Sequence, residues 1–367
     1  MIDAARPPAS ALRMLQGTAA AIVVLAGLRL GAPLLVPIAL ALFLAILSLP
    51  LFQALIARRV PAGIATLITF LVLLAAVGVF AVLLLVSLGE LRQVAPAYVA
   101  TLQERISYTA EWWQAKGISI RDWIPPRWRQ PERVAELLGG AIRGAAVFLS
   151  ETTLILLLLV FLLGESAVFP RKLERLPASV REPLLRFADV SRELQRYLVI
   201  KTLMSALIGL AAGAWVAWLD VDFAVLCGLT AFAFHFVPNI GAILAAAPAM
   251  LIAFVQHDLS KSLVVVAGYV AIGLVLGSLV EPALLGRRLG LSTLAVFLSL
   301  LIWGWLWGPI GMFLSVPLTM ALKILLAGSG EWRWVAALLE PPPGEPQLRS
   351  ETESGAAAGL ARGGEGG

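Results

Sequence analysis

Two short runs of helix-breaking residues interrupt apolar stretches of this chain and are its strongest candidates for chemistry. Proline cannot donate a backbone hydrogen bond, and glycine adopts backbone angles closed to other residues, so each run frees amide and carbonyl groups to hold a solute or ion. Broken backbone at membrane depth is tolerated only where protein covers it or where it lines a water-filled cavity. A plain helix kink would leave the same pattern, and both interpretations stay open. The transport-path candidates in these runs are Pro238, Asn239 and Gly241 in the first, and Gly308, Pro309 and Gly311 in the second.

A carboxylate ends the apolar run 261–282. Glu281 is followed by Pro282 at the edge of this run. An acidic residue at the edge of a membrane span is a functional hypothesis by default, here for binding or relaying a cation. The alternative is an interfacial carboxylate paired with Arg287 or Arg288.

Two further ionisable residues lie inside apolar stretches. Glu151 lies within the run 144–168 and must face protein or water rather than lipid, so a partner on another helix is expected. His235 precedes the first break and can exchange a proton near neutral pH. A neutral, hydrogen-bonded packing role is the favoured interpretation of this histidine.

The chain shows no enzyme motif. It holds two histidines, His235 and His257, and one cysteine, Cys227. A phosphate-binding glycine loop of the P-loop type and a HExxH pattern are both absent from the sequence. We therefore expect no catalytic residues, no metal site, no cofactor and no enzymatic function.

The composition indicates an all-α polytopic membrane protein with the lipid bilayer as its solvent. Hydrophobic residues make up 60% of the chain and charged residues 14%, and the mean hydropathy is +0.90. Soluble chains are typically about 45–50% apolar and about 25% charged. The net charge of +5 does not indicate nucleic-acid binding, because positive charge in such proteins gathers in cytoplasmic loops.

About eight membrane segments are expected, because a spanning helix needs about 20 apolar residues. Two stretches, 223–256 and 291–327, are too long for one span and carry the two breaks. The expected organisation is an N-terminal cytoplasmic segment (1–14), three membrane spans (15–88), an extracytoplasmic amphipathic helical segment (89–143), a span (144–168), a cytoplasmic basic amphipathic helix (169–198), a transport core with two broken hairpins (199–327) and a disordered cytoplasmic tail (328–367).

The distribution of positive charge favours two re-entrant hairpins that enter from opposite faces. If 223–256 folds back at its break, both of its ends stay outside, and the next span delivers Arg287 and Arg288 inside. The hairpin 291–327 then enters from the inside. Long broken full spans are the alternative. In the hairpin arrangement, 199–256 and 261–327 repeat one order of elements in inverted orientation, a common transporter architecture.

Several segments together resemble the autoinducer-2 exporter (AI-2E) family of bacterial permeases. The resemblance covers roughly residues 15–327, and one departure is Ser292-Thr293, where many relatives carry a proline. The segments are Tyr197-Leu-Val-Ile-Lys-Thr202, Phe236-Val-Pro-Asn-Ile-Gly241, Leu279-Val-Glu-Pro-Ala-Leu-Leu-Gly-Arg-Arg-Leu-Gly290, Val296-Phe-Leu-Ser-Leu-Leu-Ile-Trp-Gly-Trp-Leu-Trp-Gly-Pro-Ile-Gly311 and Leu314-Ser-Val-Pro-Leu318.

The resemblance implies a multi-pass permease of the bacterial inner membrane that forms a homo-oligomer, with both termini expected in the cytoplasm. Members of the family are associated with export of the signalling furanone autoinducer-2, and others with sodium or proton exchange. We expect a transporter that exports a small polar solute or signalling molecule. One alternative is a sodium (monovalent cation)/proton antiporter that uses Glu281 and Glu151, and another is an oligomeric membrane scaffold or passive pore.

Overall fold

The computed structural model describes residues 9–115, 139–140, 143–144, 152–166, 168, 172, 177–238, 240–285, 291–328 and 333–340. The site candidates Glu151 and Asn239 lie outside these residues. Within the described ranges the elements are helices, with no strand. They are α1 (Ala9–Leu30), α2 (Ala32–Ala57), α3 (Ala62–Ala115), an unlabelled helix (Thr152–Ser166), α5 (Ala178–Trp218), α6 (Ala224–His235), α7 (Gly241–Gln256), α8 (Leu259–Ile272), the π-helix η3 (Gly273–Val280), α9 (Glu281–Leu285), α10 (Thr293–Gly328) and α11 (Arg333–Leu338).

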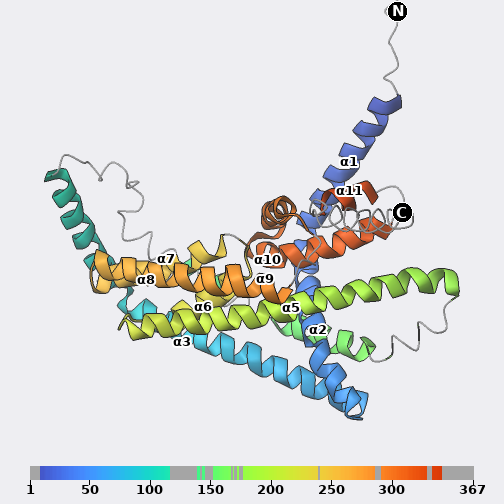
Figure 1. The fold of residues 1–367 in the computed structure, drawn as a ribbon, viewed down its shortest axis with the longest axis horizontal. Coiled ribbons are helices and arrows are strands. Elements are labelled where there is room, and N and C mark those ends of the chain that lie inside the picture. The colour runs from blue at the N-terminus through green and yellow to red at the C-terminus, as the bar shows by residue number, and fades with distance from the viewer. Residues whose placement is uncertain are drawn as a thin grey trace, which may run out of the picture.

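Helix length and composition confirm the all-α polytopic class (Figure 1). Among the described residues, five helical segments are long and apolar enough to cross a membrane. They are Ala32–Ala57, Ala62–Leu102, Arg192–Trp218, Leu259–Leu285 and Thr293–Gly328. Shorter apolar helices accompany them, among them α6 and α7, which form the first broken stretch.

Two helices continue across boundaries where the sequence pattern suggested separate segments. α3 passes position 88 without a break, and α5 passes position 198 as one helix from Ala178 to Trp218. Residues 184–208 hold neither proline nor glycine, so nothing in this part of α5 stops the helix. The basic segment therefore runs directly into the apolar one and makes no turn between them.

The stretch 223–256 folds back on itself. At its open end the Asp222 amide donates to the side-chain oxygen of Gln256 at 2.9 Å, and His257 Nε2 lies 3.1 Å from the Asp220 carbonyl oxygen. The 12 residues of α6 and the 16 of α7 span about 18 Å and 24 Å. Each arm is shorter than the hydrocarbon core of about 30 Å, so this hairpin suits a re-entrant segment.

The second broken stretch reverses at Gly308, whose φ of 64° and ψ of −146° interrupt α10. Residues on either side of the break face each other, because a Cβ added to Gly304 would lie 2.9 Å from the side chain of Met312. The open end of this hairpin is closed by α11. There the Ser292 amide donates to the Leu339 carbonyl at 2.8 Å, and Lys323 pairs with Glu340 at 3.0 Å.

The open ends of the two hairpins lie at opposite ends of one continuous helical segment. Leu259–Leu285 comprises α8, η3 and α9, has 27 residues and is about 40 Å long. It begins beside the first open end and finishes shortly before the second. α5 lies alongside it in the reverse direction, with Trp215 opposite Gly268 and Lys201 opposite Glu281 (Figure 1).

Glycines bring α5 and α6 into close contact. Gly209 and Gly213 lie one turn apart on α5, and Gly228 faces both from α6. A Cβ added to Gly228 would lie 2.8 Å from the Gly209 carbonyl oxygen. The two backbones therefore touch where side chains would hold them apart, which is the usual way in which helices associate in membranes.

The Gly228→Ala variant is expected to be less stable than the wild type. The added methyl must push two backbones apart, and overpacking of this kind costs about 1–3 kcal/mol. Thermal unfolding of the purified protein in detergent measures the effect as a lower melting temperature. Gly78→Ala on α3 is the matched control, because nothing lies within 4 Å of its added Cβ. Equal melting temperatures for the two variants would contradict the tight α5–α6 contact.

Candidate functional site

Three ionisable side chains from distant parts of the chain form one buried cluster. Lys201 Nζ lies 2.8 Å from Glu281 Oε1, and His235 Nε2 lies 2.8 Å from Glu281 Oε2. Lys201 Nζ and His235 Nε2 are 3.3 Å apart. Each oxygen of the carboxylate thus has its own nitrogen partner. We call Lys201, His235 and Glu281 the polar triad.

Each residue of the triad stands where a helix ends, bends or meets another helix. His235 is the last residue of α6, directly before the first break, and Glu281 is the first residue of α9, directly after η3. Pro282 disturbs the hydrogen-bond register of the turn before it, and the Glu281 amide accordingly donates to Leu276, five residues back. Such π-helical turns are frequent at functional sites.

The triad is withdrawn from solvent, and its two permanent charges depend on each other. The exposed fractions of the side chains are 8% for Lys201, 10% for Glu281 and 15% for His235. One ammonium and one carboxylate cancel each other, and the imidazole adds a charge only when it is protonated. A buried charge that loses its partner costs several kcal/mol, so Lys201 and Glu281 depend on each other.

Shortly after Lys201 in the sequence of α5 come two hydroxyl groups that have no hydrogen-bond partner among the described residues. Among the described residues, neither Thr202 Oγ1 nor Ser205 Oγ has a hydrogen-bond partner, and Ser205 is fully buried. Ser205 lies one helical turn from Lys201 on the same face of α5. Buried polar groups are normally satisfied, so this face of α5 offers unused capacity for water or a small polar ligand.

The two broken regions meet beside the triad. Phe236 follows His235 directly at the first break and packs against Phe313, five residues after Gly308, with 4.4 Å between ring centroids. Phe43 of α2 contacts both rings. The candidates of the two breaks are therefore joined through these aromatic rings.

Glycine is required at both breaks by close approach of the backbone. A Cβ added to Gly241 would lie 2.0 Å from the Phe234 carbonyl oxygen, and one added to Gly311 would lie 1.9 Å from the Trp303 carbonyl oxygen. Pro238 lies in the turn between α6 and α7, and Pro309 follows Gly308 inside α10. Of the described transport-path candidates, those of the two breaks thus lie at two tight reversals, and Glu281 and Pro282 lie in α9, directly after η3.

The structure brings together Glu281 and His235, which the sequence had singled out separately. His235 Nε2 lies 2.8 Å from Glu281 Oε2, and the neutral packing role of this histidine stays a prediction. The proposed partners of Glu281, Arg287 and Arg288, lie outside the described residues, and Lys201 takes that position instead. Lys201 was not predicted as a site residue, because it directly follows the basic segment 169–198 and was counted with its positive charges. Its place inside an apolar helical run was a usable signal.

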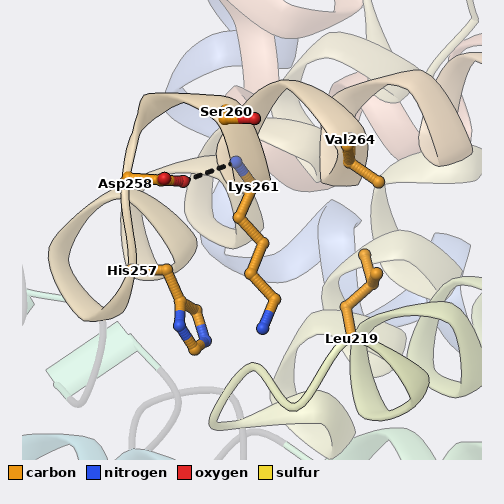
Figure 2. Close-up of a pocket in the computed structure, with 6 residues that line it drawn as sticks. All are labelled: Leu219, His257, Asp258, Ser260, Lys261 and Val264. Carbon is orange, nitrogen blue, oxygen red and sulfur yellow. Dashed lines mark hydrogen bonds between the residues drawn. The ribbon is translucent and has the colours of Figure 1, made fainter.

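A shallow pocket at the start of α8, the end of the segment Leu259–Leu285 away from Glu281, is not a comparable site. Its lining residues are Leu219, His257, Asp258, Ser260, Lys261 and Val264. Figure 2 shows Asp258 turned toward the backbone of Lys261, whose amide donates to its Oδ1 at 2.8 Å. This carboxylate therefore caps the start of α8.

Comparison with known proteins gives a consistent result over most of the chain. Residues 19–328 match the family described as AI-2E family transporter. The chain is 37% identical over 318 residues to the AI-2 transport protein TqsA of Escherichia coli strain K12, covering 87% of this chain and 92% of that protein. It is 36% identical over 335 residues to a Haemophilus influenzae protein named "Putative transport protein", covering 89% and 96%. It is 31% identical over 354 residues to the Escherichia coli K12 protein named "Putative transport protein YhhT", covering 95% and 99%.

Proposed function

This chain belongs to the AI-2E transporter family and is a multi-pass membrane permease, and we propose that it exports a small polar solute across the bacterial inner membrane. Autoinducer-2 is the first solute to test, because the relative TqsA is named as an AI-2 transport protein. One observation carries the proposal: the first break lies against both the second hairpin and the buried polar triad. No catalytic function is part of it.

The proposed path passes between the two breaks. Broken helices supply backbone groups for a polar solute, and such sites lie where two inverted repeats meet. Phe236 and Phe313 mark this meeting point, and the triad supplies polar atoms beside it. We place both termini in the cytoplasm. We also infer a homo-oligomer, for which the exposed apolar side chains of α3, such as Ile64 and Val82, offer contact area.

The direct test is transport in everted membrane vesicles, in which an exporter accumulates solute. Vesicles that contain the protein are expected to take up labelled autoinducer-2 faster than vesicles from cells that lack it. Equal uptake by the two kinds of vesicle would exclude this solute, and related small hydroxylated solutes would then be tested by competition.

Gly308→Ala is expected to slow this uptake at least about fivefold. The backbone of Gly308 lies in a region that is essentially restricted to glycine, and holding another residue there costs about 1–3 kcal/mol. Initial uptake rates, normalised to the protein found in the membrane, measure the effect. Gly63→Ala is the control, because nothing lies within 4 Å of its added Cβ. Uptake at the wild-type rate would contradict a role for this break in transport.

The buried carboxylate supports a second candidate function, monovalent cation/proton exchange. Glu281 is held between two nitrogen groups that a cation or a proton could displace. In proteoliposomes with an internal pH dye, an imposed sodium gradient would then move protons without any organic solute. Absence of that signal would leave solute export as the function.

A further inference from the structure

We propose that Glu281 is the proton-binding group that couples transport to the proton gradient, and that Lys201 neutralises this carboxylate whenever the proton is absent. The inference rests on the proposed function and names the coupling ion that this permease uses. The triad lies between the two halves of the transport core. Lys201 and His235 belong to the first half (199–256), and Glu281 belongs to the second (261–327).

The triad is therefore an ionic link between the two halves. With Glu281 deprotonated, its two oxygens hold Lys201 and His235 at 2.8 Å each, and the halves are joined. A proton on Glu281 removes the negative charge and leaves the Lys201 ammonium buried without its counter-charge. Since an unpaired buried charge is strongly unfavourable, protonation favours an arrangement in which Lys201 moves away from Glu281.

The groups that face Glu281 support this assignment. Lys201 faces it from α5 and His235 from α6. Tyr197, one turn before Lys201 on α5, is buried and adds an uncharged phenol on the same helix. η3 carries no titratable residue, and the one lysine of α10, Lys323, pairs with Glu340. Glu281 is thus the residue of the triad at which binding of a proton removes a negative charge.

A proton also needs a way to reach the carboxylate. His235 stands at the break, touches Glu281, and can pass a proton between its two ring nitrogens and the carboxylate. The hydroxyls of Thr202 and Ser205, unpartnered among the described residues, provide places for water along α5. In this step one N–H bond of His235 breaks as one O–H bond forms at Glu281, and His235 regains a proton from water. As solute moves outward, the O–H bond of Glu281 breaks and the proton passes to water on the other side of the membrane.

The test uses proteoliposomes of the full-length protein, with labelled autoinducer-2 and an internal pH dye. Two solute readouts are compared: exchange across the membrane without any gradient, and accumulation driven by a pH gradient. A gradient of about one pH unit supports up to about tenfold accumulation in one-to-one exchange. The wild type is expected to show both, and Glu281→Gln is expected to keep exchange while losing accumulation and solute-driven dye signals.

The double variant Lys201→Met/Glu281→Gln guards against misfolding, because it removes both charges together. It is expected to behave like Glu281→Gln, while Glu281→Asp restores part of the accumulation. Accumulation by Glu281→Gln at the wild-type level would overturn the inference and leave solute export intact. Solute accumulation by the wild type that is driven by a sodium gradient alone would also overturn the inference. Absence of exchange in the wild type would instead overturn the proposed function.

Discussion

Alanine at Gly241 or at Gly311 is expected to abolish export while the protein still reaches the membrane. At each position the added Cβ would lie within 2.0 Å of a backbone carbonyl oxygen, that of Phe234 or of Trp303. These oxygens belong to the helices that lead into the breaks, so they cannot move aside as a flexible side chain could. The reversal must open, and overpacking of this kind costs about 1–3 kcal/mol and occasionally more.

Everted-vesicle uptake, together with the amount of protein in the membrane, measures both effects. The expected result is uptake at the level of empty vesicles with nearly normal protein content. Gly164→Ala serves as the control, because its added Cβ has no neighbour within 4 Å. If Gly311→Ala transports as well as this control, the tight second reversal is not needed for transport.

Removing one charge of the triad is expected to cost more stability than removing two. Lys201→Met leaves the Glu281 carboxylate buried with only His235 as partner, and breaking a buried pair in this way costs about 3–5 kcal/mol. Replacing a buried pair by uncharged groups of similar volume is often neutral or stabilising. The double variant Lys201→Met/Glu281→Gln should therefore recover most of the loss.

Thermal unfolding of the four proteins of this cycle in detergent gives the coupling between the two residues. An exposed ion pair supplies the comparison: the side chains of Lys172 and Glu165 are 59% and 56% exposed. Lys172→Met is expected to change stability by less than about 1 kcal/mol, as is usual for exposed pairs. A Lys201→Met protein as stable as the wild type would show that Glu281 does not depend on Lys201.

The positions of the breaks were predictable because proline and glycine act locally. Pro238 and Gly241 mark the first reversal, and Gly308 takes a backbone conformation that its neighbours could not. The two arms of 223–256 could also be predicted, because the stretch is too long for one membrane span. The local properties of proline and glycine were thus enough to predict where the apolar stretches of the transport core are interrupted.

The triad itself could not be assembled from the sequence. Glu281 lies 80 residues from Lys201 and 46 from His235, so their contact depends on how α5, α6 and α9 pack. The full lengths of the helices could not be predicted for a related reason. α5 crosses from its basic to its apolar part with no residue that ends a helix, and only packing decides where the membrane edge falls along it.

Opposite exposure of the two open hairpin ends is the central claim about this transporter, and cysteine labelling tests it most directly. The native Cys227 is buried at 1% exposure and can be replaced by alanine to give a clean background. Ser260→Cys reports the first open end and Thr293→Cys the second, and both residues are exposed. An impermeant maleimide is expected to label Ser260→Cys from outside in spheroplasts, and Thr293→Cys only in everted vesicles. The reversed pattern, with Ser260→Cys labelled only in everted vesicles and Thr293→Cys from outside, would contradict the hairpins and favour broken full spans, and labelling of both from the same side would contradict them too.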